Sequence, residues 1–248
     1  GTDGRTIKDE SGNNNHGTFV GETFNDGDLK PSCPNCPVQT TGKYGNALRF
    51  DGTDDYVDMG NKAILNINGP ITVGLWVYWT GSGDQVLYSN VNGAVVMGIH
   101  IRTSGTNTLE VYYNYNGNYW YRYTSSFSPN MWHYIAFTFD AATSTLTLYI
   151  DGVGTSSGSS TPYPRGVANT NIGRRPDIGV AYFNGTIDEV RVYNRALSAA
   201  EVAEDMNSPY PIDRPVASYS FEKIVNNKAW DTHKSSHSAQ ALLTPPLA

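Results

Sequence analysis

The stretch Ile71-Thr-Val-Gly-Leu-Trp-Val-Tyr-Trp79 alternates with a period of two along its whole length. Such alternation is typical of a β-strand, in which successive side chains point to opposite faces of the sheet. We expect a central strand here, with Val73, Leu75 and Val77 on one face. The stretch therefore predicts β-structure in the middle of the chain.

The segments around this stretch show the same signals. Ile135–Phe139 and Leu146–Ile150 both alternate, and residues 140–145 between them predict a hairpin turn. An acidic turn at Asp51–Asp55 separates two further short apolar runs. The other predicted strands are Gly17–Val20, Ala47–Phe50, Tyr56–Met59, Val86–Ser89, Ala94–Ile101 and Glu189–Tyr193.

Only one helix is predicted, and it follows the last of these strands. Ser198 and Glu201 have the spacing of a capping box, in which each side chain bonds the other residue's backbone N–H. The helix is expected to continue to Met206 and to end before Pro209. The fold class predicted from the residues is therefore all-β with one short helix.

The composition agrees with this fold class and excludes some functions. The 248 residues include 25 glycines, 13 prolines and 17 tyrosines, which favours short strands joined by turns in one large domain or two small ones. The net charge of −6 argues against a nucleic-acid partner, because phosphates attract clustered lysine and arginine. No stretch approaches the roughly 20 apolar residues of a membrane span, so we expect none.

The chain has two cysteines, in the sequence Cys33-Pro-Asn-Cys36. Two thiolates are too few for a four-cysteine zinc site. A redox-active dithiol needs a following helix to lower the thiol pKa, and Pro34 and Pro37 oppose one. We therefore expect a short structural disulfide between Cys33 and Cys36, in an extracellular or cell-surface protein.

Four segments together resemble the laminin G-like, concanavalin A-like jelly rolls. The resemblance spans roughly residues 7–207 and implies two antiparallel sheets packed face to face. Because the motifs occur in order, they are specific for the fold, although this fold serves many ligands. The segments are Gly42–Val57, Trp132–Asp140, Leu148–Gly152 and Gly185–Ser198.

This chain departs from the family pattern at both ends. The family's opening strand is expected to be missing, since nothing before Gly1 supplies it, whereas Val216-Ala-Ser-Tyr-Ser-Phe-Glu222 resembles that strand. We predict a jelly roll over residues 1–207, a proline-rich spacer over 208–215 and an extension over 216–248. The extension would fill the vacant strand position in its own domain or in a neighbour's. Its strand residues are Val216, Ser218, Tyr219 and Phe221.

The resemblance also implies a structural Ca²⁺ site near the sheet edge. Carried onto this chain, its ligands would be Asp9, Asp51, Gly52 and Asp188. Calcium prefers six to eight hard oxygen ligands, which loops rich in aspartate and glycine provide. The alternative is that the aspartates of the 51–55 turn only bond their own turn, as aspartate often does.

A cluster of aromatic residues surrounds Asn116-Gly117, which is a strong signal for a two-residue hairpin turn. The rings of one hairpin face could stack on sugars, but cross-strand aromatic pairs also stabilise sheets without any ligand. A glycan site and a structural or interface role both remain open. The residues of this face are Glu110, Tyr112, Asn114, Tyr119, Tyr121 and Tyr123.

No catalytic carboxylate pair is predicted. A glycan hydrolase of this fold would carry two carboxylates one residue apart on a strand, where they share a face about 5 Å apart. Asp188 and Glu189 are adjacent instead, and so are Asp54 and Asp55. We therefore expect a protein that is not an enzyme. The segment Asn184-Gly-Thr186 is an N-glycosylation sequon, expected in a loop before the last strand.

Two functions follow as hypotheses. The first is a secreted structural subunit that polymerises with copies of itself into extracellular fibres, by donating the strand at 216–222 to the next copy. The second is a carbohydrate-binding or adhesion module of a larger secreted enzyme or adhesin, with polysaccharide as its partner. The pairing partner of the strand at 216–222 distinguishes a monomer from a polymer.

Overall fold

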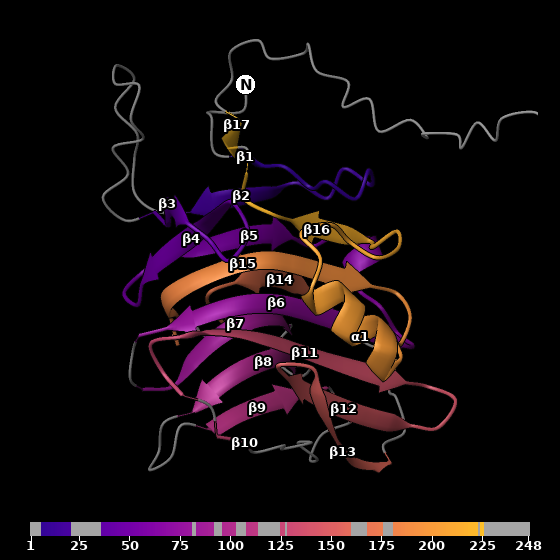
Figure 1. Ribbon diagram of the computed structural model, residues 1–248. Coiled ribbons are helices and arrows are strands. Elements are labelled where there is room, and N and C mark those ends of the chain that lie inside the picture. The colour runs from indigo at the N-terminus through magenta and orange to yellow at the C-terminus, as the bar shows by residue number, and fades with distance from the viewer. Residues whose placement is uncertain are drawn as a thin grey trace, which may run out of the picture.

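The chain forms two antiparallel β-sheets packed face to face in the computed structural model (Figure 1). This architecture confirms the predicted all-β, two-sheet sandwich with one short α-helix. The structure describes residues 6–20, 36–80, 83–91, 96–102, 108–113, 125–126, 128–159, 168–175, 181–222 and 224–225.

Sheet A has the strand order β10-β9-β8-β7-β14-β5-β2-β1-β17. Consecutive neighbours in this order run antiparallel, and β14 brings a late segment of the chain between two early ones. The strands of sheet A are β1 (Thr6–Ile7), β2 (Gly17–Val20), β5 (Tyr56–Gly60), β7 (Gln85–Val91), β8 (Val96–Arg102), β9 (Thr108–Tyr112), β10 (Ser125–Ser126), β14 (Asn169–Ile172) and β17 (Ile224–Val225).

Sheet B has the strand order β13-β12-β11-β6-β15-β4-β3, and β16 also pairs with β15. A 3-10 helix, η1 (Ala63–Leu65), and an α-helix, α1 (Ala199–Met206), complete the described elements. The strands of sheet B are β3 (Val38–Thr41), β4 (Asn46–Asp51), β6 (Ile71–Trp79), β11 (Trp132–Asp140), β12 (Thr145–Ile150), β13 (Val153–Ser159), β15 (Asn184–Tyr193) and β16 (Ala217–Tyr219).

The main core lies between the two sheets. Strand β6 has the predicted bounds, and its residues Val73, Leu75 and Val77 are fully buried in this core. Apolar residues of sheet A, such as Val57 and Ile172, close the core from the opposite side. Strand β5 also alternates between the core and the outside. Val57 and Met59 are buried, and their neighbours are only half-buried.

Helix α1 begins where the capping box predicts. The Ser198 hydroxyl accepts from Glu201 N, and the Glu201 carboxylate accepts from Ser198 N at 2.8 Å. The helix lies across the outer face of sheet B, where Val202 packs in a second apolar cluster with Trp76 and Tyr134 (Figure 1). This cover explains why the outward residues of β6 are largely buried as well. Among the described residues, no helix has the length and apolar character to cross a membrane.

A buried charge network lies beneath the helix. Arg191, on β15, contacts the Asp205 carboxylate of α1 at 3.0 Å and the Glu189 carboxylate at 2.7 Å. The hydroxyls of Tyr134 and Tyr193 donate to Asp205 at 2.7 and 2.5 Å. Burial raises the pKa of Glu189 to about 7, and the neighbouring Arg191 opposes that rise. Asp205 therefore attaches the helix to the sheet through three partners.

The tail segment Val216–Glu222, here called the closing strand, pairs within its own chain. Its core, β16, runs antiparallel to β15, with Tyr219 opposite Val190 and Ala217 opposite Val192. The first half of β15 pairs along the same edge with β4, and β6 occupies the other edge. The closing strand therefore pairs with the second half of β15, along the same edge on which β4 pairs with the first half.

The loop between β1 and β2 holds the closing strand in place. The Asp9 carboxylate accepts from Ser218 N at 2.9 Å, and Ser218 O accepts from Glu10 N at 2.9 Å. The Asn15 side-chain amide donates to Val216 O at 2.6 Å. These bonds explain the polar composition of this loop, because its side chains satisfy backbone groups of a strand that has one sheet neighbour.

Tyr219 and Phe221 enter the main core, where Tyr219 is fully buried and Phe221 is 2% exposed. The sequence boundary predicted at residue 216 therefore does not separate two packing units, because residues 216–222 complete the sandwich. Strand β15 also differs from its prediction, beginning at Asn184 and not at Glu189. Its first residues have turn-like composition, but Asp51 on β4 and Trp79 on β6 give them strand partners.

Candidate functional site

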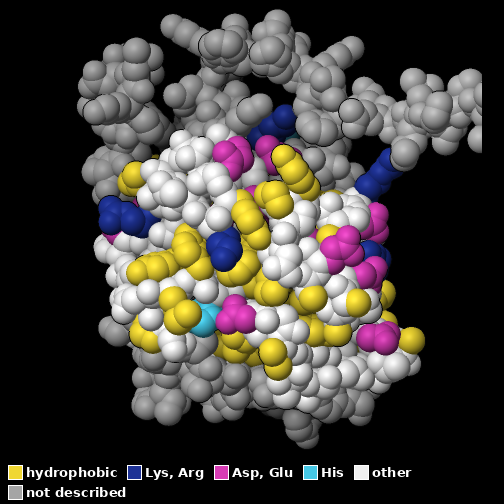
Figure 2. All heavy atoms as spheres, viewed as in Figure 1, with side chains coloured by type: hydrophobic (Ala, Val, Ile, Leu, Met, Phe, Trp, Pro, Cys, Tyr) yellow, Lys and Arg dark blue, Asp and Glu magenta, His cyan; other side chains and the backbone are white. Residues whose placement is uncertain are grey.

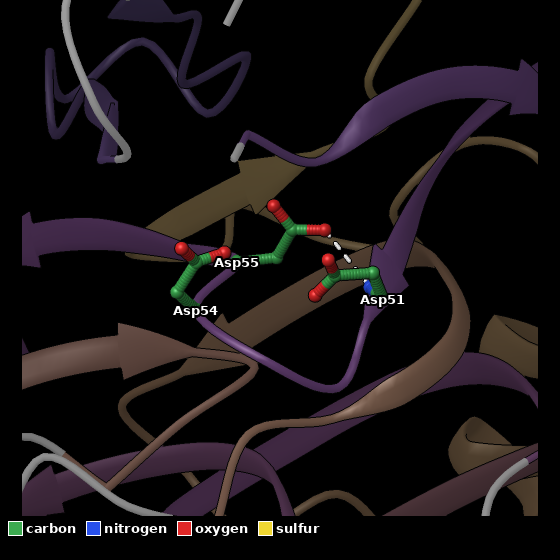
Figure 3. Close-up of side chains that lie close together, drawn as sticks. All are labelled: Asp51, Asp54 and Asp55. Atoms are coloured by element: carbon green, nitrogen blue, oxygen red, sulfur yellow. Dashed lines mark hydrogen bonds between the residues drawn. The ribbon is translucent and has the colours of Figure 1, made fainter. Parts of the chain in front are cut away.

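Three aspartates gather at the turn between β4 and β5 (Figure 3). One carboxylate oxygen from each of Asp51, Asp54 and Asp55 lies within 4.8 Å of the other two. Asp55 accepts from Asp51 N at 2.8 Å, and Asp51 accepts from Thr53 N at 2.8 Å. Gly52 has φ +84°, a conformation that side chains disfavour, so the turn requires a glycine at this position.

Asp55 is the buried member of this acidic turn. It is 3% exposed, and its second carboxylate oxygen, Oδ1, has no hydrogen-bond partner within the described part of the chain. Burial, together with the charges of Asp51 and Asp54, raises the pKa of Asp55 to about 6. Ionisation of Asp55 costs free energy, because the side chain is shielded from water and the neighbouring carboxylates repel a further negative charge.

The raised pKa of Asp55 predicts a pH dependence of stability in metal-free buffer. The folded-state pKa lies above the ordinary value, so the stabilisation by protonated Asp55 is complete below about pH 4. That stabilisation is lost as the pH rises through about 6. Asp55→Asn keeps the shape without the charge, so urea unfolding of this variant should lose less stability between pH 4 and 7 than wild type. Equal losses would contradict the burial argument.

Two tyrosines and an arginine lie beside the acidic turn and are here called the tyrosine–arginine corner. The guanidinium carbon of Arg174 lies 3.4 Å from the ring centroid of Tyr56, a cation–π contact. The rings of Tyr56 and Tyr182 are 6.5 Å apart and tilted by 52°. All three side chains are half-buried. The corner thus offers ring surface and guanidinium donors.

The structure does not bring the predicted calcium ligands together. Asp51 lies opposite Asn184 on β15, and Asp188 is four residues further along, about 13 Å away at the rise of a strand. The Asp188 carboxylate accepts from Tyr44 N at 3.0 Å. Asp9 belongs to the loop that holds the closing strand, and its two oxygens accept from four donors. Of the four predicted ligands, only Asp51 and Gly52 lie in the acidic turn.

The predicted aromatic face falls mostly outside the described residues. Glu110 is 2% exposed on β9, opposite His100 on β8, a burial that suits the structural role better than a glycan-binding one. Leu109, Val111 and Tyr113, from the same strand and its end, belong to the main core. Tyr112 belongs to β9, but its side chain is not described. Asn114, Tyr119, Tyr121 and Tyr123 lie outside the described residues.

The remaining sequence motifs are structural or untested. Cys36 is disulfide-bonded, and the only other cysteine of the chain, Cys33, lies outside the described residues. Asn184, of the sequon, is half-buried and begins β15, so it is not in a loop as predicted. Its side-chain oxygen accepts from the Thr80 hydroxyl at 3.1 Å.

The fold is a two-sheet antiparallel β-sandwich. The chain belongs to the concanavalin A-like lectin/glucanases superfamily, whose laminin G family model matches residues 51–203. This membership confirms the resemblance seen in the sequence motifs. Comparison with curated protein sequences found no match.

Solved structures share this fold at low sequence identity. Domain 4 of AbnA, a GH43 extracellular arabinanase from Geobacillus stearothermophilus in complex with arabinotriose, has a TM-score of 0.58 and 20% identity, covering 76% of this chain and 87% of that chain. A putative carbohydrate binding protein from Bacteroides ovatus has a TM-score of 0.55 and 21% identity, covering 71% of this chain and 51% of that chain. The binding domain of Paraclostridial Mosquitocidal Protein 1 has a TM-score of 0.60 and 15% identity, covering 82% of this chain and 51% of that chain. This chain therefore spans about half of the latter two proteins, and these likenesses show the fold alone.

Proposed function

We propose that this chain is a carbohydrate-binding module of an extracellular protein, and that the tyrosine–arginine corner is where it binds sugar. The observation that carries this proposal is the meeting of the Tyr56, Arg174 and Tyr182 side chains in one half-buried cluster. Aromatic rings stack on the C–H faces of sugars, while guanidinium and carboxylate groups bond their hydroxyls. The similar arabinanase domain with bound arabinotriose supports the same class of ligand.

The proposed module is not catalytic. Asp188 is fully buried and Glu189 is 3% exposed, so neither reaches a substrate from its place beneath the loop at Tyr44 and helix α1. Their neighbours are backbone N–H groups and Arg191, which suit a role in holding the sheet and helix together. The disulfide at Cys36 supports an oxidising, extracellular location.

Tyr56→Ala is expected to weaken sugar binding about tenfold, because it removes both the stacking ring and the support of the Arg174 guanidinium. The intact chain is first screened on a glycan array that includes arabinotriose and arabinan, and the best ligand is then titrated by calorimetry. Tyr210→Ala is the matched control, since Tyr210 is an aromatic residue that is 70% exposed after α1. No binding to any glycan on the array would contradict the proposed function.

A second aromatic pair provides a test of the location. The rings of Tyr78 and Trp132 lie 5.8 Å apart, edge to face, on the outer face of sheet B. Figure 2 shows hydrophobic side chains gathered across the face of the molecule that carries α1. Trp132→Ala is expected to leave the affinity unchanged. If Trp132→Ala abolishes binding and Tyr56→Ala does not, the sugar binds on sheet B and our placement is wrong.

Our proposal does not extend to fibre formation. The closing strand pairs with β15 of its own chain, and its side chains fill its own core. A closed sandwich leaves no vacancy for a donated strand. Size-exclusion chromatography with light scattering separates the two hypotheses: closure within the chain gives a monomer, and donation between chains gives polymers.

A further inference from the structure

We infer that Asp51, Asp54 and Asp55 form a Ca²⁺ site at the turn between β4 and β5. The three carboxylates already converge, with one oxygen of each within 4.8 Å of the others (Figure 3). They follow one another closely in the sequence, so a single turn carries all three ligands. The set differs from the one predicted by family resemblance, which drew Asp9 and Asp188 from other parts of the fold.

The orphaned oxygen of Asp55 is the observation that points to a ligand. A buried carboxylate oxygen without a partner costs free energy, and native structures rarely leave one unpaired. Asp55 is 3% exposed, its Oδ2 accepts from Asp51 N at 2.8 Å, and its Oδ1 has no partner among the residues that the structure describes. A cation bound among the three carboxylates would pair this oxygen and offset the mutual repulsion of the charges.

The spacing and chemistry of the ligands favour calcium. Carboxylate oxygens are hard ligands that suit Ca²⁺ and Mg²⁺ and are poor ligands for soft metals. Two oxygens on one Ca²⁺ can lie up to about 5 Å apart, and Ca²⁺ accepts a more flexible coordination geometry than Mg²⁺. Oxygens within 4.8 Å of one another therefore fit Ca²⁺ as they stand. The exposed position of Asp51 lets water complete the coordination shell.

The site also lies next to the tyrosine–arginine corner, since Tyr56 directly follows Asp55. This position provides a probe, because tyrosine transfers excitation energy to a nearby Tb³⁺, which replaces Ca²⁺ in oxygen sites. The inference does not depend on the proposed sugar-binding function. Metal binding is therefore measured without any sugar, so that each proposal can fail separately.

The test is calorimetric titration of the chelator-treated intact chain with CaCl₂, followed by Tb³⁺ luminescence excited through tyrosine. We expect saturable binding of one ion with a dissociation constant on the order of 10⁻³ M or tighter, the range of extracellular calcium modules. Asp51→Asn, Asp54→Asn and Asp55→Asn are each expected to weaken Ca²⁺ binding at least tenfold. Added Ca²⁺ should also displace Tb³⁺ and quench its luminescence.

Asp140→Asn is the matched control, because Asp140 is likewise a turn aspartate that accepts from its own turn, at Ala142 N. It should bind Ca²⁺ like wild type. If Asp55→Asn fails to fold, Asp51→Asn and Asp54→Asn decide the question, with circular dichroism to verify their folding. Absence of saturable Ca²⁺ binding below about 10 mM would overturn the inference, as would wild-type affinity in folded Asp51→Asn and Asp54→Asn variants.

Discussion

A chain truncated after Asp213 is expected to lose cooperative unfolding, because it lacks the closing strand. Val216, Tyr219 and Phe221 are 6%, 0% and 2% exposed in the core. Burial of a large apolar side chain contributes roughly 1.5–3 kcal/mol, so these three contribute about 5–9 kcal/mol. That sum is comparable to the whole stability of a typical domain, about 5–15 kcal/mol. Thermal unfolding followed by near-ultraviolet circular dichroism measures the effect.

Two controls separate the closing strand from the rest of the tail. A chain ending at Val225 keeps every described contact of the tail and is expected to unfold like the full chain. A synthetic peptide of residues 213–225 is expected to restore cooperative unfolding to the truncated chain, because strand pairing and core filling need no covalent link. If the truncated chain alone unfolds within about 1 kcal/mol of the full chain, the closing strand is not part of the domain's core.

Asp205→Ala is expected to destabilise the protein by about 3–5 kcal/mol, the typical cost of removing one partner of a buried ion pair. Asp205 is fully buried and accepts from Arg191, Tyr134 and Tyr193. Its removal leaves two phenol groups without their acceptor and the Arg191 guanidinium with only Glu189 as a carboxylate partner. The change in the midpoint of urea unfolding at neutral pH measures the loss.

Asp213→Ala is the matched control for this network. Asp213 also pairs with an arginine, Arg195, at 3.2 Å, but its side chain is 52% exposed. Exposed pairs contribute about 0–1 kcal/mol, so this variant should unfold close to wild type. Similar losses for Asp205→Ala and Asp213→Ala would contradict the view that burial makes the first pair important.

The local features of the fold could be predicted from the sequence. Strand β6 has the predicted bounds, since alternation over nine residues leaves little freedom of register. The start of α1 follows from Ser198 and Glu201, which satisfy each other's backbone groups. The beginning of β15 at Asn184 could not be predicted, because its strand character depends on partners at Asp51 and Trp79, far away in the sequence.

The closing strand was recognised in the sequence, but its partner was not. Periodicity shows that Tyr219 and Phe221 share a face. The path of the spacer at 208–215 decides whether they reach β15 of their own chain or β15 of another copy. The bonds from Asp9 and Asn15 to this strand also had no sequence signal, because side chains that bond a distant backbone follow no pattern. The family resemblance implied Asp9 as a calcium ligand, and in the structure its carboxylate accepts from Ser11 N and Ser218 N.

Only part of the candidate site could be predicted from the sequence. The run Asp51-Gly-Thr-Asp-Asp55 is plainly an acidic turn, and turn chemistry alone explains it as well as a metal does. Arg174 and Tyr182 come from another part of the chain and reach Tyr56 only through the pairing of β14 with β5 and the return of the chain to β15. Such convergence depends on the fold and leaves no local motif.

The most direct test of the proposed function is a titration of the isotopically labelled chain with its best glycan ligand, followed by amide and side-chain NMR shifts. We predict that the shifts concentrate at Tyr56, Arg174 and Tyr182, with smaller changes in the acidic turn. Shifts centred on Tyr78 and Trp132, or no shifts at saturating glycan, would contradict the proposal.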